Sequence, residues 1–444
     1  MHRDNDAVNA RLRKLLNLMS ETFWVMPAVM VLVGVLGGVG LVSLDRSGLV
    51  PMWLIDNAWL YNGGGTGART LLGVVAGSTI GVAGTVFSIT IAALTLAAGQ
   101  MGPRLLRNFT RDRGNQATLG IFLGTFSYAL MVLRSVRTQD EGAFTPHLSL
   151  TVAIALGFVC VATLVYFVGH MASRINVDTV IGLVGQELHE TLARLTTQEP
   201  QPAPPPDAYW KDAVAVTDPR RGYLQEIDGD GLAAWAAENG TTIRLLVRPG
   251  DYVFPGTAIA LMTPPVEDAD DAIRTATALG PTRMSTSDLE FAVRQLVEVA
   301  VRALSPSIND PHTAMGVVDR LGAALCDVAP MFLPTGVYLR DGRAALVMPS
   351  FEYGGLVDAM FHMIRQNATR NPAVVMRVLE VLSSVVGIER APARVAELRR
   401  HADLLLADAE RDIRTPADLD DVRQRRATFD LVDRVGAKGR IGAY

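Results

Sequence analysis

The stretch "GSTIGVAGTVFSITIAALTLAAG", residues 77–99, carries no ionisable side chain, and it decides the fold class. The uncharged run around it extends from Arg69 to Arg104. A helix of roughly 20 apolar residues crosses the hydrocarbon core of a bilayer, so this run predicts a membrane-spanning helix. Residues 70–99 would form a helix of about 45 Å against a core of about 30 Å. We therefore expect the helix to tilt or to continue beyond the cytoplasmic face of the membrane.

Three further stretches are uncharged and long enough to span a bilayer, residues 22–44, 114–133 and 148–169. The chain has 444 residues, of which 49% are hydrophobic, and its apolar residues are concentrated in the first 175. The first stretch is too long for the core of a signal peptide, and no small-x-small cleavage site follows it, so we expect it to be retained. The sequence thus predicts a four-helix transmembrane domain over residues 1–175.

The basic residues of the loops predict the orientation of these spans. The N-terminal segment "RLRKLL" is basic, and the loop after the second span carries four arginines, Arg104, Arg107, Arg111 and Arg113. The first and third loops contain acidic residues instead, namely Asp45, Asp56, Asp140 and Glu141. Because basic loops stay in the cytoplasm, we expect both termini to be cytoplasmic. The arginines have two simple roles, topology and contact with lipid headgroups. In a symmetric oligomer they would instead form a ring that favours anions at a pore mouth.

The second span has one face of small and hydroxyl-bearing residues. Its members are Gly73, Gly77, Ser78, Gly81, Thr85, Ser88 and Ala92. Two interpretations stay open. Rows of small residues let helices pack closely within a bundle, and hydroxyls with glycine carbonyls can also line a wet path through a pore. No span contains a charge, and His170 lies only at the cytoplasmic end of the fourth, where we interpret it as an interfacial side chain. An ion-coupled transporter is therefore disfavoured.

The remainder of the chain predicts a cytoplasmic α+β part. Residues 176–210 indicate a helical extension and a proline-rich linker. Residues 211–263 contain strands and Pro-Gly turns, and the segment "PGDYVFPGTAIA" reads as a hairpin that resembles the barrel-sandwich fold of biotinyl and lipoyl carrier domains. Those carriers need an attachment lysine, and none follows Lys211 in this segment, so the resemblance implies architecture only. Residues 264–414 predict a mainly helical domain with a β-hairpin around Asp341-Gly342, and 415–444 a polar tail.

One loop of the helical region concentrates polar side chains between two predicted helices. It carries Arg302, Ser305, Asn309, Asp310, Asp319 and Arg320, besides His312. The first turn of a helix favours an anion, so this loop is a candidate site for an ion or small ligand. The alternative is a capped helix–loop–helix, in which Asp310 is the N-cap before Pro311 and pairs with Arg302.

Several function classes are disfavoured. A net charge of −4 gives no reason to expect nucleic-acid binding, and Cys160 and Cys326 are too far apart to form a disulfide framework or a spaced metal motif. The chain contains no GxSxG with a triad, no HExxH and no phosphate-binding loop. We therefore expect no enzyme activity, no cofactor and no metal site.

The chain also resembles a known family. The segment from "AGTVFSITIAALTLAAGQMGPRLLRNFTRDRG" to "SYALMVLR", together with "RGYLQEID", "RPGDYVFPGT" and "RQLVEVAVRALSPSINDPHTA", is similar to the bacterial predicted membrane proteins called domain of unknown function 2254. The resemblance covers nearly the whole chain and departs at His312, where an aromatic residue is expected. It implies a bacterial inner-membrane protein with a large cytoplasmic portion, and it supplies no reaction or substrate.

From these observations we expect a homo-oligomeric ion channel or pore in the lipid bilayer, with the second span at its axis and a cytoplasmic sensing part. The alternative is a non-conducting sensor or scaffold that is anchored by its spans and binds a cytoplasmic ligand or partner.

Overall fold

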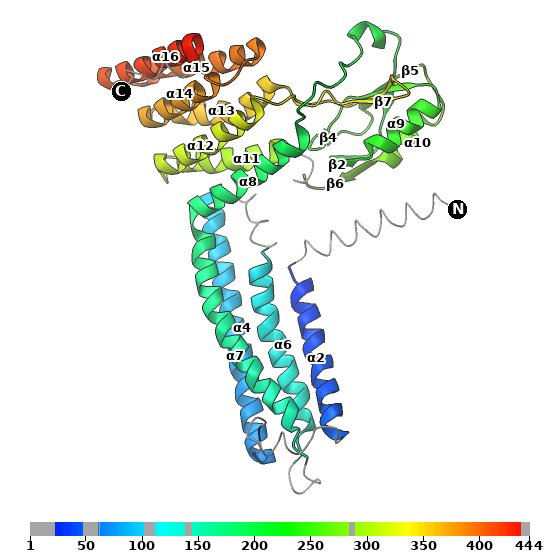
Figure 1. Ribbon diagram of the computed structural model, residues 1–444, viewed down its shortest axis with the longest axis vertical. Coiled ribbons are helices and arrows are strands. Elements are labelled where there is room, and N and C mark those ends of the chain that lie inside the picture. The colour runs from blue at the N-terminus through cyan, green and yellow to red at the C-terminus, as the bar shows by residue number, and fades with distance from the viewer. Residues whose placement is uncertain are drawn as a thin grey trace. The chain divides into compact units, whose positions relative to one another are not determined.

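A computed structural model describes residues 23–47, 61, 63–101, 112–137, 144–283 and 289–436. The chain forms two compact units that meet between Thr179 and Val180. The first unit holds four long apolar helices, and the second holds two β-sheets and the remaining helices (Figure 1).

In its described residues the first unit contains the long helices α2 (Val25–Arg46), α4 (Gly65–Met101), α6 (Arg113–Ser135) and α7 (His147–Ile175). All four are long and apolar enough to cross a membrane, which confirms the four predicted spans. Helix α4 has 37 residues, or about 55 Å at 1.5 Å per residue. It is therefore longer than the predicted 70–99 at both ends and exceeds the hydrocarbon core by nearly twofold.

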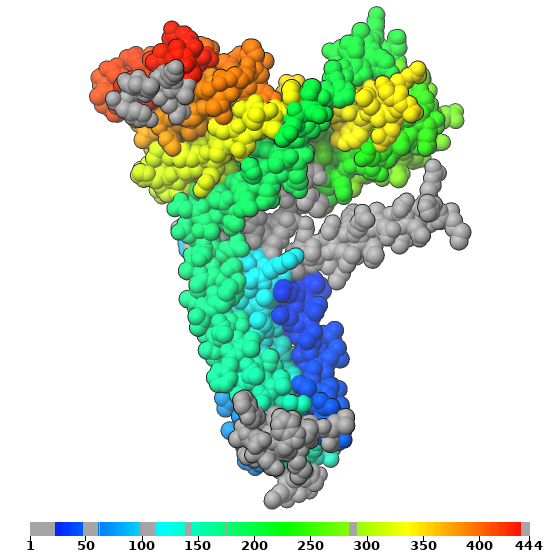
Figure 2. All heavy atoms as spheres, viewed as in Figure 1, coloured from blue at the N-terminus to red at the C-terminus, as the bar shows by residue number. Residues whose placement is uncertain are grey.

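Helix α6 is the centre of this unit. Half of its span is buried, compared with 17–28% of the other three, and it packs against α2, α4 and α7. Glycines bring α2 and α6 together, because a Cβ atom on Gly38 would lie 2.8 Å from Cβ of Met131. At one end of the bundle Asp45 of α2 accepts hydrogen bonds from the backbone N–H groups of Leu148 (3.1 Å) and Ser149 (3.0 Å), and so caps α7. Side chains fill the spaces between the ribbons in the space-filling view (Figure 2).

Helix α8 (Val177–Leu195) follows α7 but does not continue it. Asn176 between them has an extended backbone with ψ of 121°, and its side chain accepts a hydrogen bond from the N–H of Asp178 at 2.9 Å. The expected helical extension is therefore a separate helix. Its apolar residues lie on one face as predicted, with Val180, Val184 and Leu188 buried.

Two sheets form the β part of the second unit. The five-stranded sheet has the order β1 (Val214–Thr217), β5 (Ala258–Thr263), β3 (Thr242–Leu245), β8 (Arg343–Val347), β7 (Val337–Arg340). The three-stranded sheet has the order β4 (Tyr252–Val253), β2 (Gly222–Ile227), β6 (Thr277–Gly280). Helices α9 (Gly229–Glu238) and α10 (Ala269–Ala276) pack against this part, and the short helix η3 (Asp207–Trp210) precedes it.

The predicted hairpin over "PGDYVFPGTAIA" is wrong. The turn at Gly256 exists, with φ of 80°, but β4 pairs with β2 whereas β5 pairs with β1 and β3. The turn therefore carries the chain from one sheet to the other. The hairpin around Asp341-Gly342 is confirmed, and its strand β8 joins the β part by pairing in parallel with β3. The barrel-sandwich arrangement stays a prediction.

Six helices complete the second unit, α11 (Leu289–Ala303), α12 (Pro311–Val328), α13 (Tyr353–Ala368), α14 (Pro372–Val386), α15 (Pro392–Asp412) and α16 (Pro416–Val435). They stack as three consecutive pairs. Helix α11 contacts α13, which contacts α15, and α12 contacts α14, which contacts α16 (Figure 1). The helices predicted at 354–369, 372–387 and 393–412 are confirmed. Residues 416–435 of the predicted polar tail form α16 instead, because buried Val422, Phe429 and Val432 pack it onto the stack.

Candidate functional site

The small-residue face of α4 points away from the other helices of its own bundle. In the described part of the chain, Cβ atoms built on Gly73, Gly77 and Gly81 would meet nothing within 4 Å. The buried face of α4 is a different row, formed by Ala68, Leu72, Ala76, Thr79, Ala83, Val86, Ala93 and Ala97. At 3.6 residues per turn the two rows lie about 180° apart around the helix. The interpretation of tight packing inside the bundle of one chain is therefore wrong for these glycines.

The hydroxyl groups on this face are satisfied by the helix itself. Ser78 donates to the carbonyl of Val75 (3.2 Å), and Thr85 donates to the carbonyl of Gly81 (3.2 Å). The hydroxyl of Ser88 donates in the same way to Gly84 (2.9 Å), and Ala92 is exposed beside them. No donor on this face therefore needs water, while the hydroxyl oxygens keep their capacity to accept hydrogen bonds.

The basic loop is only partly described, since Arg104, Arg107 and Arg111 lie outside the described residues. Arg113 is exposed at the first position of α6. Its neighbour Asp112 is buried and caps α6 by accepting from the N–H of Gly114 at 2.8 Å.

Asp112 also connects α6 to the last turns of α7. Its carboxylate lies 2.6 Å from Nε2 of His170 and 3.1 Å from Nε of Arg174. A Cβ on Gly114 would lie 2.6 Å from the same His170 nitrogen, so only glycine leaves room for this contact. His170 is thus a structural partner of a buried carboxylate. Its sequence position at the end of a span did not reveal that partner, which lies 58 residues away.

The predicted ligand loop is dispersed. Asp310 accepts from the N–H of Thr313 at 3.2 Å and from its hydroxyl at 2.7 Å, so the N-cap interpretation is confirmed. Asp319 pairs with Arg377 of α14 at 2.7 Å. The side chain of Arg320 lies against Gly185 of α8.

The other three residues, Arg302, Ser305 and Asn309, lie at the end of α11 and in the loop after it. The carbonyl of Arg302 accepts from the N–H of Ser305 at 3.0 Å, and the carbonyl of Ser305 accepts from the N–H of Asn309 at 2.9 Å. Arg302 lies in the last turn of α11, Ser305 Oγ is 3.2 Å from Ser307 Oγ, and Asn309 is exposed with φ of 49°. Asp319 lies on α12, nine residues after the N-cap Asp310, or about 13 Å further along the helix. The six residues therefore occupy several environments, and their joint role in binding a ligand stays a prediction.

A cluster that sequence reasoning missed joins α13 to α15. Asp358 and His362 lie one turn apart on α13, and His401 projects from α15. Nε2 of His362 and Nε2 of His401 lie 2.9 Å and 2.8 Å from the same oxygen, Oδ1 of Asp358. His401 is fully buried, and within the described structure the Nδ1 atoms of both rings have no hydrogen-bond partner.

The protonation states of this cluster follow from its surroundings. Burial lowers the pKa of His401 to about 4, against the opposing effect of its hydrogen bond with Asp358, so its ring is neutral at pH 7. Burial alone would raise the pKa of Asp358, but hydrogen bonds from Arg400 and His401 outweigh it and hold that pKa below its usual value. A neutral imidazole and an ionised carboxylate therefore face each other, both in the protonation state that binds metal ions.

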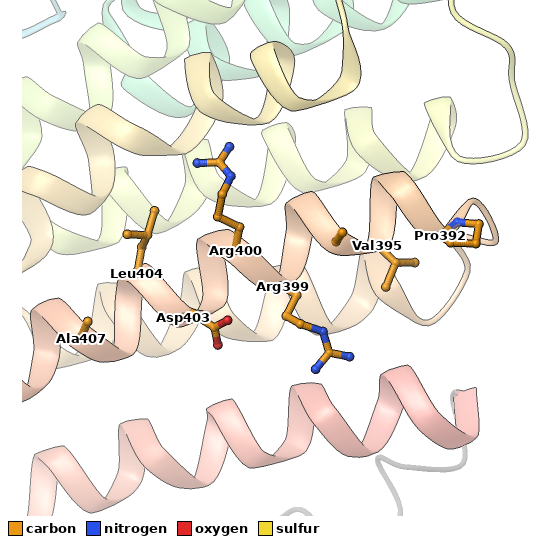
Figure 3. Close-up of a pocket in the computed structure, with 8 residues that line it drawn as sticks. Pro392, Val395, Arg399, Arg400, Asp403, Leu404 and Ala407 are labelled. Atoms are coloured by element: carbon orange, nitrogen blue, oxygen red, sulfur yellow. The ribbon is translucent and has the colours of Figure 1, made fainter.

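The spacing of Asp358 and His362 is readable from the sequence, but His401 is not, because it lies 39 residues further along the chain. Next to it, α15 carries a shallow groove of 580 Å³ that runs along its exposed side. Figure 3 shows Arg399 and Arg400 of this groove pointing to opposite sides of α15. Arg399 pairs with Asp430 and Asp433 of α16, whereas Arg400 reaches Asp358 of α13 at 2.5 Å.

Comparison with known proteins identifies the family of this chain. A family model described as a predicted membrane protein (DUF2254) matches residues 20–384. An uncharacterized protein of Mycobacterium tuberculosis and one of Mycobacterium bovis are each 33% identical over 426 residues, which is 92% of this chain and 80% of each relative. No solved structure matches the chain. With four helices fit to span a bilayer and this match over most of its length, the chain belongs to the DUF2254 family of predicted membrane proteins.

Proposed function

We propose that this membrane protein assembles with copies of itself through the small-residue face of α4, and that the assembly is an ion channel or pore. The observation that carries the proposal is the position of Gly73, Gly77 and Gly81, which lie opposite the buried face of α4 and have no neighbour among the described residues. Glycine rows in membrane helices serve close helix–helix contact. Since the bundle of one chain does not use this row, a second chain is its natural partner.

The chemistry of the same face supports conduction. In a ring of subunits, copies of α4 would bring Ser78, Thr85 and Ser88 toward a common axis, with their donors already satisfied and their oxygens available to ions or water. The loop after α4 would place Arg104 and Arg107 at one mouth, which favours anions. The family resemblance supports a bacterial inner-membrane location, and the basic loops support an orientation with both termini in the cytoplasm.

The rival function is a non-conducting sensor or scaffold, in which α4 mediates assembly and the second unit binds a cytoplasmic partner. A membrane enzyme has less support, because the acid and base groups described near the spans are engaged in structural contacts, Asp112 with His170 and Arg174, and Asp45 with the first turn of α7.

The test compares Gly77→Leu with Val165→Leu. Val165 is 72% exposed on α7, so its substitution places the same leucine side chain on a face that we expect to contact lipid. The purified proteins are sized in detergent and then reconstituted in liposomes and planar bilayers under a KCl gradient. We expect an oligomer with anion-selective conductance for the unchanged chain and for Val165→Leu, and loss of both oligomer and conductance for Gly77→Leu.

A monomeric unchanged chain would overturn the assembly. An intact oligomer without conductance under voltage, tension or ligand would reject the channel in favour of the scaffold.

A further inference from the structure

We propose that Asp358, His362 and His401 bind one divalent transition-metal ion, of the chemical class of Zn²⁺, and that this ion fastens α13 to α15. The inference concerns the second unit and does not depend on whether the protein conducts ions. Its basis is the convergence of two imidazoles and one carboxylate from two neighbouring helices.

The distances suit a metal centre. One ligand atom from each of the three residues lies within 4.8 Å of the other two. Ligands about 2.0–2.1 Å from a tetrahedral zinc ion lie about 3.3 Å from one another. The two imidazole nitrogens lie 2.9 Å and 2.8 Å from the carboxylate oxygen, so small side-chain rotations suffice to admit an ion between them.

The metal-free arrangement concentrates donors on one atom. Nitrogen atoms of His362, His401 and Arg400 all approach Oδ1 of Asp358, and that of Arg400 lies 2.5 Å away. A carboxylate oxygen has only two lone pairs with which to accept hydrogen bonds from them. The rings of His362 and His401 lie against each other, with their centroids 4.8 Å apart. A metal ion would replace three competing donors by one cation that binds both rings and the carboxylate.

Arg400 is the cation that an incoming metal ion must displace, and the structure provides it with a second partner. Its Nε lies 2.8 Å and its terminal nitrogen 2.7 Å from Oε2 of Glu397. Arg400 can therefore leave Asp358 and remain paired with Glu397 on its own helix. The metal ion and Arg400 thus compete for Asp358.

The ligand set selects the class of ion. Two imidazoles with one carboxylate suit zinc and other first-row transition ions, whereas Mg²⁺ and Ca²⁺ prefer oxygen ligands. The side chains of Asp358 and His362 are 37% and 34% exposed, so a fourth coordination position would face solvent. Three protein ligands with an open position are typical of accessible zinc sites.

The first test is a titration of the full chain in detergent, purified without a polyhistidine tag and stripped with EDTA. Zn²⁺ is added at pH 7 in competition with a chromogenic chelator, and Mg²⁺ is titrated in parallel. We expect one Zn²⁺ per chain and no competing effect of Mg²⁺. His362→Ala should weaken binding at least about tenfold. His189→Ala is the matched control, because His189 pairs with Asp327 at 2.7 Å and belongs to no candidate metal cluster among the described residues, and it should leave binding unchanged.

The second test leaves all three ligands in place, so it does not depend on the folding of ligand variants. Arg400→Gln should tighten Zn²⁺ binding several-fold by removing the competing cation, whereas Arg399→Gln, on the opposite side of α15, should leave it unchanged. Absence of stoichiometric Zn²⁺, equal binding of Mg²⁺, equal affinities of His362→Ala and the unchanged chain, or no gain in Arg400→Gln would each overturn the proposal.

Discussion

Gly34 of α2 and Gly124 of α6 lie in direct backbone contact, since a Cβ atom on Gly34 would overlap the carbonyl oxygen of Gly124. A Cβ on Gly124 would in turn lie 2.9 Å from the carbonyl oxygen of Met30. Close packing through small residues within one chain is therefore a property of the α2–α6 pair. Gly73, Gly77 and Gly81 of α4 have no such neighbour among the described residues, so they differ from the glycines of α2 and α6 in what surrounds them.

This contact predicts a sharp difference between two glycines of the same helix. Gly34→Ala forces α2 away from α6 and should lower the stability of the four-helix unit by about 1–3 kcal/mol. Gly40→Ala should have no such effect, because a Cβ there meets nothing within 4 Å in the described structure. Thermal unfolding in detergent, followed by size-exclusion chromatography, measures both. Equal melting temperatures would contradict the tight crossing.

The carboxylate of Asp112 predicts a second loss of stability. Asp112→Ala removes the N-cap of α6 and leaves His170 and Arg174 without their shared partner. Truncation of a buried ion pair costs about 3–5 kcal/mol, because the remaining charge stays unpaired. The same unfolding measurement should show an intermediate loss for Asp112→Asn, which keeps an oxygen for the cap. Arg113 is exposed, so the stability of Arg113→Ala should match that of the unchanged chain. A loss of stability in Arg113→Ala equal to that in Asp112→Ala would contradict the structural role of Asp112.

Features that depend on neighbouring residues were predictable from the sequence. The four spans follow from uncharged runs, the N-cap at Asp310 from the proline after it, and the turn at Asp341-Gly342 from residues that adopt positive φ. Each of these signals lies within one element, so no tertiary partner is needed to read it.

Features that depend on distant partners were not predictable. A Pro-Gly turn at Gly256 looks the same whether its two strands pair with each other or enter different sheets, as β4 and β5 do. A row of glycines likewise does not show which helix it faces. The sequence therefore suggested close packing for the glycines of α4, whereas the structure shows it between α2 and α6. His401 reaches Asp358 only because α13 and α15 are neighbours in the stack.

A buried ion pair in the β part predicts a pH dependence of stability. Asp218 accepts from the backbone N–H of Arg220 at 2.8 Å and from its guanidinium, which also binds the carbonyl of Thr277 at 3.1 Å. Burial alone would raise the pKa of Asp218, but the hydrogen bonds and charge of Arg220 outweigh it and hold the pKa below 3.8. The folded chain therefore binds fewer protons than the unfolded chain at this site.

The stability that Asp218 contributes is complete above about pH 4 and is lost as pH falls through the lower folded pKa. Asp218→Asn should cost about 1.5–3 kcal/mol at pH 7 and flatten the decline of stability below pH 4. Urea unfolding at several pH values tests this. Asp230→Asn is the control, because Asp230 is 82% exposed and its pair with Arg340 is a surface contact. A decline of the same slope in Asp218→Asn and the unchanged chain would refute the assignment.

The last helix of the stack predicts a local effect of a single aromatic side chain. Phe429 is fully buried, Arg426 stacks on its ring at 5.1 Å, and α16 covers α14. Phe429→Ala should destabilise the stack by about 3–5 kcal/mol, because it leaves a cavity between the two helices. Hydrogen exchange measured by mass spectrometry should then rise in α14 as well as in α16. Val435→Ala, at a residue that is 54% exposed, should leave exchange in α14 unchanged. If α14 stayed protected in Phe429→Ala, α16 would be an appendage rather than the closing layer of the stack, and its burial of α14 would contribute nothing to stability.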